Sequence, residues 1–228
     1  YFARHDGQAV TCDDFLAAMA DANHVNLDAF ERWYKQAGTP QITIRRSAGS
    51  GPNEMVLALT QHTPETAAKT PRHAVPIPIR IAFLDGAGAI VPTRLAEDSP
   101  AQREHVILLA KEQQDQPIYA ANASGLTPSI LRNFSAPVTI DDDLSCDERR
   151  HIMRYDTDLF NRWDTAQTLI SDEILAVAAN PSVPVNGTSI AALADGFGHI
   201  LADPSCLDYF KAAILTLPAI SVLESRMA

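Results

Sequence analysis

The amino-acid sequence predicts an α+β chain in which a central antiparallel β-sandwich is flanked by α-helical segments. In the middle of the chain apolar residues recur at every second position, and on both sides they recur at three- and four-residue spacing. Eleven of the fifteen prolines fall between Pro40 and Pro137, where they exclude long helices. These patterns predict helices over residues 1–38, a sandwich over 39–143 and helices over 144–228.

The composition limits the partners and the compartment. The formal net charge of −10 argues against nucleic acid or an anionic membrane surface, because both are bound by basic faces. No apolar run reaches the roughly 18 residues that predict a membrane span. The three cysteines are few and far apart, which predicts no disulfide framework and favours a reducing compartment: Cys12, Cys146 and Cys206. We therefore expect a cytoplasmic chain.

Two helices with strong boundary signals are predicted before the sandwich. Thr11 and Asp14 have the spacing of a capping box, and Asn26 is the predicted N-cap of the second helix. Gly38 and Pro40 follow as stop signals, so we expect a domain boundary there. The second helix carries an apolar stripe that we expect to pack on helices outside this chain: Leu27, Phe30, Trp33 and Tyr34.

A hairpin is predicted at the centre of the sandwich. Its first strand has one apolar face, made of Ile77, Ile79, Ile81 and Phe83. Residues 85–88 supply glycines for a tight reversal, and residues 89–91 would begin the return strand. Three prolines predict edge positions, because proline cannot donate to a ladder: Pro76, Pro78 and Pro92. A hairpin alone is only marginally stable, so further strands are expected around it.

Those further strands are short and separated by turn signals. They are predicted at residues 41–45, 55–60, 103–113, 118–120, 129–135 and 136–140. The strand over 103–113 is apolar on both faces over its middle. Six to eight such strands are typical of a sandwich of about 100 residues.

After residue 143 the helical spacing returns. Helices are predicted over residues 144–155, 158–179, 187–201 and 205–217. Pro181 ends the second of them, and Pro218 ends the last.

A search for catalytic chemistry yields no site. The sequence lacks His-Glu-x-x-His, Gly-x-Ser-x-Gly and a phosphate loop, and residues 86–88 are too short for a dinucleotide fingerprint. The acidic run 141–143 could bind a hard cation, but a solvated linker explains it as well. Three residues on one helix could form half of a metal site, yet their spacing also suits a surface helix: Asp147, Glu148 and His151. We therefore predict no catalytic, substrate-binding or metal-ligating residue.

Two tryptophans could anchor a partner, but both lie on apolar stripes and are predicted to be core residues. They are Trp33 and Trp163, and each directly follows an arginine. Arg32 and Arg162 could pair with acids at the seams between helices and sandwich, although a solvated arginine is the default.

Three stretches of the sequence resemble bacterial aminopeptidase N. The first is residues 1–40, which end in ERWYKQAGTP. The second combines PIPIRIAFLDGAGAIVP at residues 76–92 with LRNFSAPV at 131–138. The third is DLFNRWDTAQTL at residues 158–169. The order and spacing of the three match along the whole chain.

The resemblance implies an internal fragment of a cytosolic zinc metallo-aminopeptidase with a thermolysin-like catalytic domain. Residues 1–38 would be the last catalytic-domain helices, 39–143 an Ig-like sandwich, and 144–228 the start of a C-terminal helical domain. The parent would remove N-terminal residues from peptides with zinc-activated water and a glutamate as general base. Its zinc motif would precede Tyr1, so the chain itself would bind no zinc and be inactive. The sandwich would act as a spacer.

The implied partners are the remaining domains of the parent and, in the parent, a peptide substrate. A homodimer of the fragment is also expected, because a second amphipathic stripe lacks much of its helical domain: Phe160, Trp163, Ile170 and Ile174. A different interpretation stays open, in which the chain is a free-standing β-sandwich interaction module with helical flanks.

Overall fold

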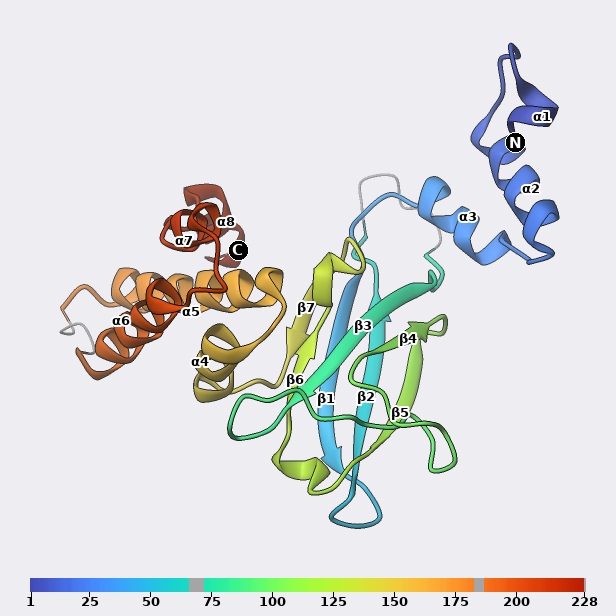
Figure 1. Cartoon of the computed structure of the whole chain (residues 1–228). Helices are drawn as coiled ribbons and strands as arrows, with labels where there is room; N and C mark the ends of the chain where they lie inside the picture. Colours follow the sequence, from blue (N-terminus) through green and yellow to red (C-terminus); the bar gives the residue numbers. More distant parts are fainter. Residues whose placement is uncertain (66–71, 183–186, 228) are drawn as a thin grey trace.

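The computed structural model describes residues 1–65, 72–182 and 187–227. A β-sandwich lies at the centre, with helices at both ends (Figure 1). Before it come α1 (Phe2–His5), α2 (Cys12–Asn23) and α3 (Asp28–Lys35). After it come α4 (Cys146–Tyr155), α5 (Leu159–Ala179), α6 (Gly187–Ala202), α7 (Asp208–Ile214) and α8 (Ile220–Met227). The predicted α+β class, with a sandwich between helical segments, is therefore confirmed.

The sandwich consists of a four-stranded sheet, in the order β5-β2-β1-β7, and a three-stranded sheet, in the order β4-β3-β6. The strands are β1 (Gln41–Ala48), β2 (Glu54–His62), β3 (Ile77–Leu84), β4 (His105–Leu109), β5 (Gln113–Tyr119), β6 (Thr127–Ile130) and β7 (Thr139–Asp142). The ladders between these strands are antiparallel, apart from that of β1 and β7, which is parallel. This ladder departs from the predicted antiparallel sandwich. After β6 in the other sheet, the chain crosses to the edge of the four-stranded sheet, where β7 runs parallel to β1.

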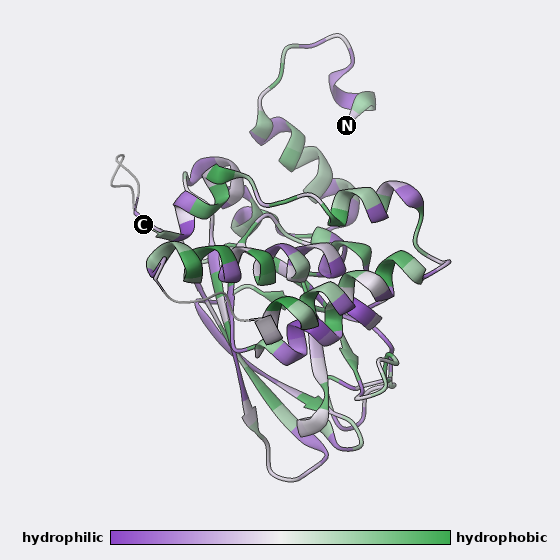
Figure 2. Ribbon diagram, turned by 90° about the vertical axis from the view of Figure 1, so that its left-hand side faces the viewer, coloured by the Kyte–Doolittle hydropathy of each residue, from purple (hydrophilic) through white to green (hydrophobic). Residues whose placement is uncertain are grey.

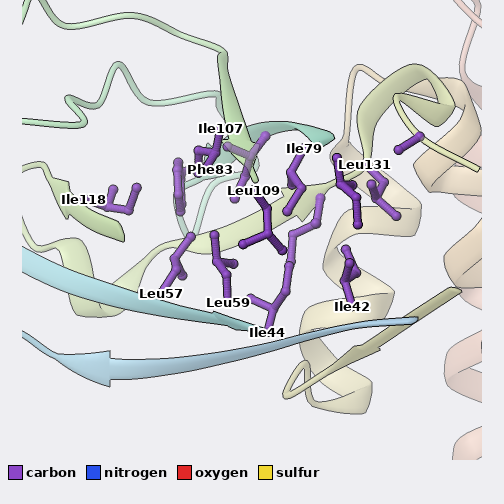
Figure 3. Packing of buried hydrophobic residues seen from close by; sticks show 14 of the residues in the cluster. Ile42, Ile44, Leu57, Leu59, Ile79, Phe83, Ile107, Leu109, Ile118 and Leu131 are labelled. Carbon is purple, nitrogen blue, oxygen red and sulfur yellow. The ribbon is translucent and has the colours of Figure 1, made fainter. Parts of the chain in front are cut away.

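The core lies between the two sheets, where side chains of β1 and β2 meet those of β3 and β4 (Figure 3). The four residues predicted to face inward from β3 are all fully buried: Ile77, Ile79, Ile81 and Phe83. Burying one such side chain stabilises the fold by about 1.5–3 kcal/mol. The predicted register of this strand is therefore confirmed.

The predicted central hairpin is only partly right. The turn forms as expected, because the Gly88 amide donates to the Asp85 carbonyl at 2.9 Å. The return segment, however, makes an isolated bridge between Ile90 and Leu84, and β3 forms its ladders with β4 and β6 instead. Pro92 follows the bridge and has no N–H with which to extend it.

Pro78 also departs from its prediction, since it lies in the middle strand of its sheet. The ladder of β3 with β6 covers only residues 81–84, so Pro78 has no strand partner on that side. Arg80, which points its amide to the same side as Pro78, donates to the Ser135 hydroxyl at 3.0 Å rather than to a strand. A proline fits there because no ladder bond is lost.

The strand predicted over residues 103–113 is shorter than predicted: β4 covers His105–Leu109, and Gln113 already begins β5 in the other sheet. Along β4, Ile107 and Leu109 are buried, whereas Val106 and Leu108 are 54% and 56% exposed. An edge strand with one face toward solvent explains the alternation, even though both faces are apolar.

The N-terminal ends of the first helices lie at or close to their predicted positions. The Thr11 and Asp14 capping box is present. The second helix begins at Asp28 rather than after Asn26, but the Asn26 side chain still accepts from the Asp28 amide, at 2.7 Å. That helix ends at Lys35, so Gly38 with its φ of 102° belongs to the following link.

The C-terminal helices enclose a second core, and the predicted helix over 205–217 is shorter than expected. That core contains Met153, Ala166, Leu169, Ile200, Cys206, Phe210 and Ile214. Each helix carries both hydrophobic and hydrophilic residues, as Figure 2 shows. After Pro218 the chain forms α8. The sequence pattern does not predict this helix, because a proline at this position also fits the end of the preceding helix. Proline also occurs close to the starts of helices, as it does here.

Candidate functional site

A group of buried polar side chains joins the sandwich to the C-terminal helices. It forms where the turn after β6 meets the corner between α4 and α5. The turn is a 3₁₀ segment, η2 (Arg132–Phe134), with unusual backbone geometry. Leu131, Asn133 and Phe134 have φ values of 57°, 54° and 51°, in the left-handed region that non-glycine residues rarely adopt. Such residues persist where surrounding contacts hold them.

Arg132 is the centre of this group. Its guanidinium donates to the carboxylate of Asp156, whose side chain is 0% exposed. It also donates to the Glu104 carboxylate at 2.8 Å and to the Thr157 hydroxyl at 2.8 Å. Burial alone would lower the pKa of Arg132, but the charge of Asp156 and the bonds to Glu104 and Asp156 outweigh it and raise that pKa. The guanidinium is therefore a permanent charge bridging both regions.

Ser129 and Asn161 complete the group. The Ser129 hydroxyl donates to Asp156 and accepts from Arg132 at 2.9 Å and from Asn161 Nδ2 at 2.7 Å. Asp158 caps α5 by accepting from the Asn161 amide at 2.8 Å, and its other oxygen accepts from the Asn133 amide at 2.9 Å. One carboxylate thus starts the helix and fixes the left-handed turn.

One carboxylate of the acidic run at residues 141–143 forms a second contact between the regions: Asp142 reaches α4, whereas the arginine partners of Asp141 and Asp143 lie on β1. Asp141 pairs with Arg45 at 2.6 Å, and Asp142 pairs with Arg149 at 2.6 Å. Asp143 pairs with Arg46 at 2.7 Å. Asp141 and Asp143 are exposed, as a solvated linker would be, but each of the three carboxylates has an arginine partner, which that interpretation does not include.

The three residues that could form half of a metal site contact three separate partners. Glu148 binds Arg46, and Asp147 binds Arg150 at 2.6 Å. His151 Nε2 lies 2.7 Å from the Asp85 carbonyl. Burial alone would raise the pKa of Glu148, but its bonds from Arg46 and Ser145 lower it to about 2.

A third contact brings the turn at residues 85–88 onto α4. A Cβ atom at Gly88 would lie 2.4 Å from the Tyr155 Cβ, and the φ of Gly88 is +85°. Only glycine fits this approach without movement of the helix or the turn. At Gly86, by contrast, no atom lies within 4 Å of a built Cβ.

The two tryptophans pack on different cores. Trp33 packs on the sandwich core, and Arg32 donates to the Ala74 carbonyl at 2.6 Å rather than to an acid. Trp163 packs on the second core. Arg162 pairs with Asp203 at 3.0 Å inside the helical region, not at the seam. The expectation that the whole stripe of α3 faces outside partners is therefore wrong for Trp33, while Phe30 and Tyr34 stay 39% and 53% exposed.

Residue types that could bind a metal are dispersed. In residues 1–65, 72–182 and 187–227, no three His, Cys, Asp or Glu side chains converge as metal ligands would. The three cysteines are free, with Cys206 buried. Within the same residues, no helix is both long enough and apolar enough to cross a membrane. That the chain carries no catalytic, substrate-binding or metal-ligating residue stays a prediction.

Two family models match the chain. Residues 38–143 match a family described as a domain of unknown function, DUF3458, with an Ig-like fold. Residues 146–228 match one described as DUF3458_C, a domain of unknown function with ARM repeats. The sandwich and the helical region that follows it thus each resemble a known family.

Curated relatives match almost the whole chain. Aminopeptidase N of Escherichia coli is 33% identical over 227 residues, which are 97% of this chain and 25% of the relative. Aminopeptidase N of Caulobacter vibrioides is 36% identical over 96% of this chain and 24% of the relative. Aminopeptidase N of Haemophilus influenzae is 30% identical over 96% of this chain and 25% of the relative. The chain spans about a quarter of the length of these relatives.

A solved structure shows the same fold. Legionella pneumophila aminopeptidase A, in complex with aspartic acid, superposes with a TM-score of 0.78 at 24% identity, over 98% of this chain and 24% of that one. Sequence and fold therefore show that the chain resembles bacterial aminopeptidase N, over a segment about a quarter as long as that protein.

Proposed function

We propose that the chain is a non-catalytic segment of a cytoplasmic, zinc-dependent aminopeptidase that removes N-terminal residues from peptides. The observation that carries the proposal is the similarity to three bacterial aminopeptidases N along 96–97% of the chain. The catalytic chemistry is assigned to parts of the parent outside this chain. The described residues do not fit a zinc site, so none of them is assigned a role in the reaction.

Within the parent, the sandwich acts as a rigid spacer between the catalytic domain and a C-terminal helical domain. In this proposal residues 1–38 belong to the catalytic domain, 39–143 form the spacer, and 144–228 begin the helical domain. The three contacts at the C-terminal junction support it: the Arg132 group, the pair of Asp142 with Arg149, and the turn at Gly88. A spacer needs a fixed angle, and contacts from three separate segments provide one.

The first test reads the coding frame upstream of Tyr1 and assays its full-length product. We expect bound zinc and cleavage of an aminoacyl reporter by the full-length protein, and neither by the 228-residue chain. A natural start codon at this position, without a zinc motif before it, would favour the free-standing interaction module.

The spacer role needs a separate test in the full-length enzyme. Arg132→Ala should lower kcat/KM toward peptides while the zinc content of the folded enzyme stays unchanged, because the variant loosens the junction and not the catalytic domain. Arg45→Ala is the matched control, since its pair with Asp141 is about half exposed on both sides. Equal activity of both variants and the parent would reject the spacer role but not the assignment to an aminopeptidase.

The proposed partners are the other domains of the parent and its peptide substrates. A homodimer of the isolated chain is proposed as well, because Phe30 and Tyr34 expose an apolar edge of α3. Sedimentation at two protein concentrations would detect it, and a concentration-independent monomer would reject it.

A further inference from the structure

A cleft of about 880 Å³ lies between the sandwich and the C-terminal helices. Its walls come from β7, α4, α5 and α8, with the link of residues 216–219 at one side. A smaller cavity of about 310 Å³ adjoins it, and both are lined by Ile140, Asp142, Arg149, Asp164 and Thr168. The two cavities therefore share a wall of mostly polar side chains.

Most charged groups on this cleft are already paired. Asp142 binds Arg149 at 2.6 Å, and Asp141 binds Arg45 at 2.6 Å. Arg226, on α8, binds Asp172 at 2.5 Å. These pairs neutralise one another and leave little net charge on that part of the wall.

Asp164 is different. In the parts of the chain that the structure describes, its carboxylate has neither a hydrogen-bond donor nor a direct ion-pair partner, and it lines both cavities. Burial raises the pKa of Asp164; the charge of Arg149 opposes this and that of Asp142 adds to it. An unpaired carboxylate on the wall of a partly buried cavity destabilises the fold unless a cation or a hydrogen-bond donor binds it.

The surroundings indicate which kind of cation would fit. A hard metal ion needs several oxygen ligands, and the described residues offer no group of three candidate ligands here. An anion would be repelled by Asp164. Trp163, Pro218 and Val222 give the same cleft apolar surface, and Thr168 is a further polar residue on its wall. An ammonium group with an apolar substituent matches both features.

We propose that this cleft binds a small organic primary ammonium ion, with Asp164 as its counter-ion and the surface around Trp163 and Pro218 covering its apolar part. The site is independent of the proposed peptidase function. It lies at the junction, so an occupant would contact both the sandwich and the helices.

The test uses benzylammonium and the neutral benzyl alcohol as probes of the 228-residue chain. Amide shifts in two-dimensional NMR spectra are followed during titration. We expect benzylammonium to shift amides of residues 140–142, 163–168 and 216–222 saturably, and benzyl alcohol to shift them far less. Equal responses to both probes, or shifts elsewhere on the chain, would overturn the proposal without any variant.

Variants sharpen the test. Asp164→Asn removes the charge and should weaken benzylammonium binding roughly 10-fold or more, since hydrogen bonds to charged groups contribute about 1.5–3 kcal/mol. The variant is expected to fold, because it removes an unpaired charge from a partly buried position. Asp147→Asn is the matched control, because Asp147 is 91% exposed and lies outside the cleft. Unchanged affinity of Asp164→Asn, or an equal loss in the control, would contradict the assignment.

Discussion

The sandwich is attached to helices at both ends, and the two attachments differ in chemistry. At the C-terminal junction, side-chain charges meet side-chain charges, with Arg132 and Asp156 buried together. At the N-terminal end, α3 and the residue after it donate from three side chains to backbone carbonyls. Arg32 binds Ala74 O at 2.6 Å, Trp33 Nε1 binds Pro76 O at 3.0 Å, and Gln36 Nε2 binds His73 O at 3.0 Å.

The difference separates two ways of fixing an angle between regions. A backbone carbonyl is present whatever side chain its residue carries. The N-terminal attachment therefore places few demands on the sequence of the segment that it contacts. A buried charge network fails as a whole when one member is missing, because the remaining charge stays buried without a partner. The C-terminal junction is therefore the more specific attachment and the more vulnerable one.

The largest effect is expected from Arg132→Ala. The change leaves the fully buried Asp156 carboxylate without its cation and should lower the free energy of unfolding by about 3–5 kcal/mol. Urea denaturation of both proteins measures it. Arg45→Ala removes a half-exposed pair and should cost at most about 1 kcal/mol. Equal losses would show that the buried junction pair contributes no more than an exposed pair within the sandwich.

A change inside the sandwich should weaken both attachments together. Ile79→Ala creates a cavity at a fully buried position and should cost about 2–4 kcal/mol in urea denaturation. Arg80, the next residue, pairs with Glu104 at 3.1 Å at a partly exposed face. Arg80→Ala should cost at most about 1 kcal/mol. If the two variants lose the same free energy of unfolding, β3 does not turn Ile79 toward the core and Arg80 away from it.

A pH effect at the C-terminal junction should follow from Glu148. Its pKa falls from 4.5 to about 2 in the folded chain, so the unfolded chain binds the proton more tightly. The stabilisation is complete above pH 4.5 and is lost as the pH falls toward 2. Because the pair is partly exposed, we expect about 1 kcal/mol. Glu148→Gln should flatten this part of the stability profile, and an unchanged slope would show that Glu148 does not cause this pH dependence.

The smallest effect is expected at the N-terminal attachment. Trp33→Phe removes the donor to the Pro76 carbonyl and should cost about 0.5–1 kcal/mol. Hydrogen exchange should accelerate in α3 and stay unchanged in β3. Tyr34→Phe is the control, since Tyr34 is 53% exposed. Faster exchange throughout the sandwich would mean that α3 is not a separate attachment.

The sequence predicted the features that depend on local pattern. Period-two spacing located β3 and its buried face, and capping residues located the start of α2. The buried face of β4 could not be predicted in this way, because both of its faces are apolar and the opposite sheet decides which one is covered. The parallel pairing of β7 with β1 joins residues about 100 positions apart and leaves no local signal.

The junction was beyond sequence reasoning for a related reason. Its members, Ser129, Arg132, Asp156 and Asn161, are ordinary polar residues spread over several elements and a turn. The motifs LRNFSAPV and DLFNRWDTAQTL pointed to this place, since they contain Arg132 and Asn161, and they did so through a resemblance rather than through chemistry. The pairs of residues 141–143 were missed because an acidic run is usually solvated, and its arginines lie on β1 and α4.

The left-handed turn at Leu131, Asn133 and Phe134 has a consequence for protein synthesis. Each such residue costs about 1–3 kcal/mol and keeps its conformation only where its surroundings hold it. Its support comes from Asp156 and Asp158, which leave the ribosome after the turn itself. β7, which completes the four-stranded sheet, follows the turn along the chain. The nascent sandwich therefore reaches its final form only when α5 has begun, which makes the two regions one unit during folding even though each has its own core.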